Sequence, residues 1–185
     1  MARKAQYSFQ VALETSLAFI GVLFLLKATE ALLHISFRHF GILPRTLIGL
    51  PGIFFSPLLH SSMGHLAANS VPLLVLLTIL LSTREYHPYR TLALVWGLSG
   101  LGTWLIGRGE AFHIGASSVV FGLAAFLIVA GFMLKSWKSA GITIFVLVFY
   151  GGIFYGALPQ NGPISWEGHL CGAIAGAWTA RRTLA

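Results

Sequence analysis

The chain is organised around the stretch His113-Ile114-Gly115-Ala116-Ser117-Ser118-Val119-Val120-Phe121-Gly122, in which two serines stand between glycines at the start of a long apolar run. The run predicts a membrane-spanning helix over about residues 117–133. A hydroxyl at the start of such a helix is held rigidly and, with small neighbours, stays accessible. Serines and glycines in membrane helices more often serve packing, so Ser117 is a candidate nucleophile only if a base lies beside it.

The composition excludes several classes of protein. The 185 residues are 56% hydrophobic and 9% charged, whereas soluble domains carry about 25% charged residues. The chain is therefore expected to be a polytopic membrane protein without a sizeable soluble domain. The basic residues are scattered, so no nucleic-acid-binding face is expected. The single cysteine, Cys171, excludes an intramolecular disulfide and a cysteine-cluster metal site.

Apolar runs predict an all-α bundle of six membrane spans in one domain over residues 1–185. The spans are expected at about 11–35, 62–81, 92–106, 117–133, 142–158 and 168–183. The third and sixth are shorter than the roughly 20 residues a lone span needs, but short spans survive inside a bundle. Glycines and prolines interrupt the apolar segment 36–59, which predicts short helices half embedded in the membrane surface. Lys27 and Glu30, one helical turn apart, predict a snorkelling ion pair.

The basic residues in the connections predict the orientation. One side holds Arg3, Lys4, Arg84, Arg90, Lys135, Lys138, Arg181 and Arg182, and the other holds Arg38, Arg45 and Arg108. We therefore expect both termini to be cytoplasmic, in a multi-pass protein of the cell (inner) membrane.

Polar residues converge at one depth in this topology. The second, fourth and sixth spans run in the same direction, and each has its polar residues at its start. These residues are His60, His65 and Asn69, then Ser117 and Ser118, then His169. Intramembrane polar groups are costly and are typical of functional sites. The topology therefore predicts one layer of these groups near the outer leaflet.

The chemistry of this layer favours nucleophilic catalysis. A neutral histidine, His169, can take the proton of the Ser117 hydroxyl. His65, the Asn69 amide and the backbone N–H of Ser117 can donate to an oxyanion. The chain contains no aspartate, so a Ser-His dyad is expected. Glu167, two residues from His169, does not share its helix face and is expected to be a loop or cap carboxylate.

The spacing supports a close approach of two helices. His169, Gly172 and Gly176 fall on one helix face, and the Gly172-xxx-Gly176 pair lets a neighbouring helix come very near. Gly115 and Gly122 likewise leave little side-chain bulk around Ser117.

Together these motifs resemble the rhomboid family of intramembrane serine proteases. They are His60-xxxx-His65-xxx-Asn69, Gly115-x-Ser117 and His169-xx-Gly172-xxx-Gly176, and segments 41–45 and 55–60 are similar to the family's first loop. The resemblance covers about residues 36–176. It implies a six-helix rhomboid-like bundle with a water-filled cavity open to the outside. It also implies a serine endopeptidase that, without a cofactor, cleaves single-span proteins of the lipid bilayer in or near their transmembrane segments.

The resemblance also implies a role for each matching residue. Ser117 would be the nucleophile and His169 the general base, with His65 and Asn69 as oxyanion donors. His60 would support the site, and Phe121 would pack on the catalytic histidine.

One position departs from the family pattern. Ser118 stands where a glycine usually follows the nucleophile, although the Gly115-x-Ser frame favours Ser117. An alternative is therefore a catalytically inactive rhomboid-like protein that binds membrane clients. A metal or haem held by His60, His65, His113 and His169 is a third hypothesis, but no carboxylate or H-E-x-x-H motif accompanies them, so no metal is expected. The oligomeric state is left open.

Overall fold

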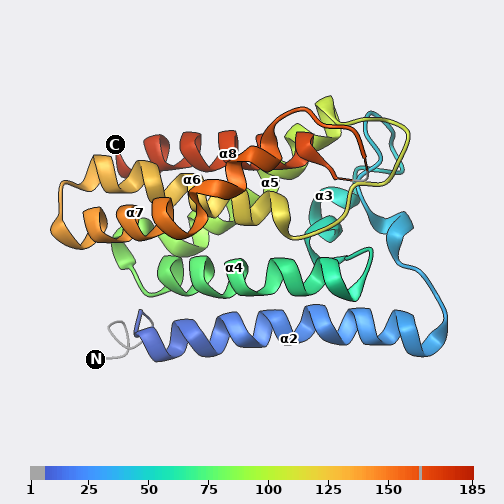
Figure 1. The fold of residues 1–185 in the computed structure, drawn as a ribbon, viewed down its shortest axis with the longest axis horizontal. Helices are drawn as coiled ribbons and strands as arrows, with labels where there is room; N and C mark the ends of the chain where they lie inside the picture. Colours follow the sequence, from blue (N-terminus) through green and yellow to red (C-terminus); the bar gives the residue numbers. More distant parts are fainter. Residues whose placement is uncertain (1–6, 163) are drawn as a thin grey trace.

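The computed structural model describes residues 7–162 and 164–185, and within them the chain is helical without a β-strand. The predicted charges Arg3 and Lys4 lie outside the described residues. The long helices are α2 (Phe9–Leu33), α4 (Met63–Leu81), α5 (Pro88–Ile106), α6 (Ser117–Leu134), α7 (Trp137–Tyr150) and α8 (Trp166–Leu184). Figure 1 shows them side by side along the long axis of the molecule.

Serines start four of these helices. Ser8, Ser62, Ser136 and Ser165 each accept a hydrogen bond from the backbone N–H three residues later, at the N-termini of α2, α4, α7 and α8. Such a cap satisfies one of the N–H groups that the first helical turn leaves unpaired. Helix α6, by contrast, follows Ala116 and has no side-chain cap among the described residues.

Four segments are long and apolar enough to cross a membrane: α2, α4, α6 and the continuous stretch Trp137–Ala157. That last stretch joins α7 to the 3₁₀ helix η4 (Gly151–Ala157) and begins before the predicted fifth span. Helices α5 and α8 have 19 residues each, so both extend beyond the apolar ranges 92–106 and 168–183 in which the sequence predicts spans. The extension has a physical cause at α5, because Pro88 is compatible with the first helical turn, where its missing N–H has no partner to lose.

Helix α6 lies at the centre of the bundle. It packs most extensively against α8 and also contacts α4, α5 and α7, whereas α2 lies at the edge against α4. Figure 1 shows α4, α6 and α8 running in one direction and α2, α5 and α7 in the other. The starts of the three helices that carry the polar residues therefore lie at the same end, as the sequence predicts.

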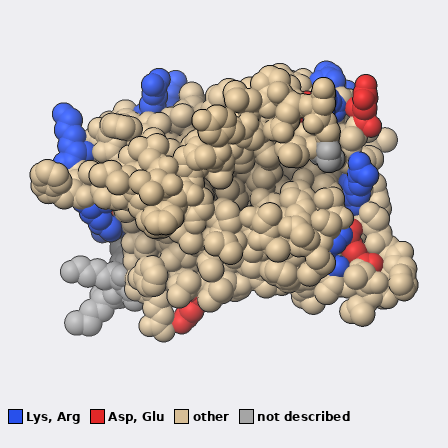
Figure 2. Space-filling view, viewed as in Figure 1, with Lys and Arg blue, Asp and Glu red and all other residues tan. Residues whose placement is uncertain are grey.

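The face of the molecule in Figure 2 has the charge distribution of an integral membrane protein. On the face in Figure 2, charged side chains gather mainly at the two ends of the long axis, with some acidic surface at the lower edge. The uncharged zone between the ends follows the long helices of Figure 1. Charges avoid the hydrocarbon layer because their desolvation there is costly.

The broken segment after α2 contains three short helices and joins the loop before α6. They are η1 (Arg38–Phe40), α3 (Gly52–Phe55) and η2 (Ser56–Leu58). Ile42 and His113 exchange backbone hydrogen bonds of 3.0 and 2.8 Å, and the Gly115 N–H donates to the Ser56 carbonyl at 2.8 Å. The segment therefore holds the backbone that leads directly into Ser117.

Candidate active site at the start of α6

Ser117 and His169 meet between α6 and α8. The Ser117 Oγ lies 2.8 Å from the His169 Nε2, a hydrogen-bond distance at which the hydroxyl can pass its proton to a neutral ring. Both residues are half-buried, so they remain accessible. The predicted juxtaposition of this serine with this histidine, 52 residues later in the chain, is therefore present in the structure.

Two glycines of α8 permit this approach. A Cβ added at Gly172 would overlap the Ser118 carbonyl oxygen, and one added at Gly176 would overlap the Gly122 carbonyl oxygen. Helix α8 thus packs directly on the backbone of α6. The predicted close contact through Gly172-xxx-Gly176 is confirmed, and it brings the His169 ring within reach of Ser117.

The second ring nitrogen of His169 is held by a backbone carbonyl. The Nδ1 lies 2.9 Å from the Gly156 oxygen in η4, so the ring donates there and keeps its Nε2 lone pair for the Ser117 hydroxyl. This tautomer is inferred from the partners, because a carbonyl can only accept. Phe121 stacks on the same ring, with centroids 4.2 Å apart and planes 15° apart. The packing of Phe121 on His169 is confirmed, whereas Gly156 is a partner that the sequence did not predict.

Gly115 lies against the His65 ring. Its φ of +124° is a backbone conformation that favours glycine. A Cβ there would stand 2.7 Å from the His65 Cε1 and 2.9 Å from its Nε2. The other ring nitrogen of His65, Nδ1, lies 3.1 Å from the Ser61 Oγ. The Nε2 edge of His65 therefore faces the backbone that leads into Ser117, on the side where the sequence predicts oxyanion donors.

His60 and Asn69 lie on either side of His65 in the sequence and contact different backbone groups. The His60 ring is buried, and its Nε2 accepts a hydrogen bond from the Ala116 N–H at 3.3 Å. The buried Asn69 amide donates to the His65 carbonyl at 3.0 Å, which leaves its second N–H group for another acceptor. His60 thus contacts the residue before the nucleophile, whereas Asn69 makes its hydrogen bond to the backbone of its own helix.

Ser118 borders a cavity of about 20 Å³ beside Ser117, large enough for one water molecule. The other residues around it include His113, Gly115 and Ser165. The serine at this position therefore lies next to open space within the site.

Glu167 is in the first turn of α8, as expected for a carboxylate at a helix start, but it is buried. Its side chain is 2% exposed, and its Oε1 lies 2.6 Å from the Arg108 Nε. Arg108 also donates to the Gly162 and Ile164 carbonyls. The pair therefore ties the loop after α5 to the start of α8. Within residues 7–162 and 164–185, no group of three or more potential metal-ligating side chains gathers.

Comparison with known proteins agrees with these features. The family described as "Rhomboid domain" matches residues 49–185. The chain is 43% identical over 171 residues to "Uncharacterized protein Rv1337" of Mycobacterium tuberculosis (strain ATCC 25618 / H37Rv), covering 88% of this chain and 71% of that protein. It is 40% identical over 171 residues to "Uncharacterized protein ML1171" of Mycobacterium leprae (strain TN), covering 88% and 67%. No solved structure matches the chain. The family match spans well over half of the sequence, and the chain therefore belongs to the rhomboid family.

Proposed function

We propose that this protein is an intramembrane serine endopeptidase that cleaves transmembrane segments of membrane proteins through a Ser117–His169 dyad. The observation that carries the proposal is the 2.8 Å contact between the Ser117 Oγ and the His169 Nε2. The opposite ring nitrogen is held by the Gly156 carbonyl, which supports the tautomer that a general base requires.

The reaction proceeds in two halves. The Ser117 Oγ attacks the scissile carbonyl carbon while its proton passes to the His169 Nε2. The resulting tetrahedral intermediate collapses to an ester on Ser117, and His169 gives the proton to the departing amine. Water then attacks the ester with His169 again as base, which releases the acid and restores the hydroxyl. No cofactor is needed for these steps.

The oxyanion would lie between α6 and α4. The Ser117 backbone N–H lies in the first turn of α6, where helix geometry gives it no partner within the helix, and the helix dipole also favours negative charge at this end. The His65 Nε2 and the second N–H of Asn69 supply further donors. Preorganised donors of this kind account for a large share of the rate of acyl transfer.

The same proposal places the chain in the bilayer as a single six-span domain with both termini cytoplasmic. Helices α5 and α8 would be the two less apolar spans, screened from lipid by their neighbours. Segment 36–59 would be half embedded, because Leu47, Ile48 and Phe54 are 83, 74 and 70% exposed and such apolar surface favours lipid over water. Substrates would reach Ser117 from the outer side.

The test uses purified protein in detergent, a model transmembrane substrate and a fluorophosphonate probe. Wild type should cleave the substrate and be labelled, and Ser117→Ala and His169→Ala should do neither. A folded wild-type protein that stays unlabelled would instead favour the inactive client-binding alternative, for which the Ser118 substitution is the sequence observation.

A further inference from the structure

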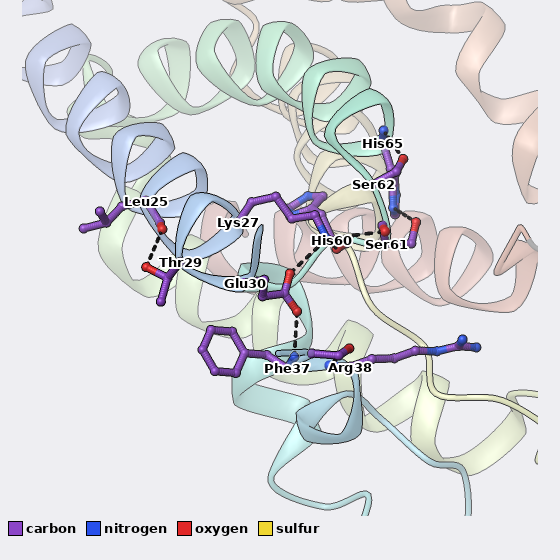
Figure 3. A network of polar contacts seen from close by, with 11 residues as sticks. Leu25, Lys27, Thr29, Glu30, Phe37, Arg38, His60, Ser61, Ser62 and His65 are labelled. Atoms are coloured by element: carbon purple, nitrogen blue, oxygen red, sulfur yellow. Dashed lines mark hydrogen bonds and ion pairs between the residues drawn. The ribbon is translucent and has the colours of Figure 1, made fainter. Parts of the chain in front are cut away.

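Lys27 and Glu30 of α2 form the predicted ion pair, but they do not snorkel. The Lys27 Nζ lies 2.9 Å from the Glu30 Oε2, and the two side chains are 17% and 11% exposed. Lys27 reaches across to the chain before α4 and donates to the His60 carbonyl at 3.0 Å and the Ser61 carbonyl at 3.4 Å. Figure 3 shows Lys27 between Glu30 and these two residues. An ammonium has three N–H donors, and all three have partners here.

The carbonyls that Lys27 binds belong to residues that contact the candidate site. The His60 ring accepts the Ala116 N–H at 3.3 Å, directly before Ser117. The Ser61 hydroxyl lies 3.1 Å from the His65 Nδ1. One side chain on α2 therefore restrains the backbone of two residues whose own side chains hold the nucleophile's loop and the His65 ring.

Glu30 extends the same restraint to the broken segment. Its second oxygen, Oε1, accepts the Phe37 N–H at 2.6 Å, as Figure 3 also shows. The pair thus joins α2 both to the start of segment 36–59 and to the chain directly after it. An ion pair on a membrane helix can form without such backbone partners. Here the additional hydrogen bonds offset part of the desolvation cost of the two half-buried charges.

We propose that Lys27, oriented by Glu30, is a positioning residue that sets the His60–Ser61 backbone and thereby the oxyanion side of the site. The expected effect on kcat rests on the proposed peptidase function. Helix α2 lies before the matched family region at 49–185, so the restraint comes from outside that region.

The test compares Lys27→Met, Lys27→Arg and the double variant Lys27→Met/Glu30→Gln. Lys27→Met removes the donors at similar length, and we expect kcat to fall about tenfold with little change in KM, as for other residues that orient a site. Lys27→Arg should recover part of kcat, because a guanidinium also donates to carbonyls. In Lys27→Met the Glu30 carboxylate has lost its cation. The double variant removes that negative charge, while the glutamine at position 30 can still accept the Phe37 N–H. Thr29→Val is the matched control on the same helix, because the Thr29 hydroxyl donates to the Leu25 carbonyl of its own helix.

Hydrogen–deuterium exchange provides a readout independent of activity. Lys27→Met should speed exchange in residues 60–65 and at Ala116 while the core of α6 and α8 stays protected. If the double variant regains wild-type kcat and exchange, the single variant suffers only from an uncompensated carboxylate and the positioning role is wrong. If wild type has no activity but the exchange pattern changes as expected, the peptidase proposal fails while the restraint stands.

Discussion

Phe121 and His169 stack nearly face to face, with their ring planes 15° apart. The contact joins α6 to α8 one turn beyond Ser117 and fixes the plane of the proposed base. Phe121→Leu keeps an apolar side chain but removes the stack, which is worth about 1 kcal/mol. We therefore expect kcat to fall about fivefold. Phe121→Tyr retains the ring and should stay near wild type in the same peptidase assay, and equal activity of the leucine variant would contradict the role.

Replacement of Gly172 should separate α6 from α8. The Cβ of Gly172→Ala would overlap the Ser118 carbonyl oxygen, so the helices must move apart and the Ser117–His169 hydrogen bond lengthens. We expect loss of both probe labelling and thermal stability. Gly21→Ala is the control, because a Cβ at Gly21 meets no described residue within 4 Å and alanine stabilises a helix interior by roughly 0.5–1 kcal/mol. Normal labelling of Gly172→Ala would show that the close approach is dispensable.

Ser118 should be dispensable as a nucleophile. Ser118 lies beside the small cavity, and removal of its side chain would only widen that cavity. Ser118→Gly should therefore retain probe labelling and peptidase activity. Ser117→Ala should lose both. The opposite pattern, with labelling abolished by Ser118→Gly and retained by Ser117→Ala, would reassign the nucleophile.

Acid should destabilise the protein through His60. Burial, followed by the nearby His65 and Lys27, lowers the pKa of His60 from 6.5 to about 4. The unfolded chain therefore binds a proton at higher pH than the folded protein does. The free energy of unfolding should fall as the pH drops through the window between these two pKa values, by on the order of 3 kcal/mol.

The measurement is unfolding in detergent at several pH values across that window. His60→Asn should flatten the dependence, whereas His34→Asn is a control at the exposed, left-handed C-cap of α2. An unchanged slope in His60→Asn would assign the acid sensitivity to another group.

The sequence predicts the helices and the Ser117–His169 pair better than it predicts the backbone groups that hold the site's side chains. Ser117 and His169 are predictable because helices that run the same way place their starts at one depth. Gly172 and Gly176 are predictable because small residues at that spacing permit close packing. The Gly156 partner of His169 and the His60 and Ser61 partners of Lys27 use backbone carbonyls, and every residue type carries one, so no sequence pattern marks them.

The uncapped start of α6 carries a thermodynamic consequence. Four other helices use a serine cap, and a cap typically contributes about 1 kcal/mol to stability. The described part of the chain omits it at Ala116, the helix start that borders Ser117. Helix α6 therefore forgoes stability that α2, α4, α7 and α8 gain, and in the proposed reaction the negative charge that suits its first turn comes from the substrate oxyanion. The first turn of α6 thus combines lower local stability with the proposed catalytic role.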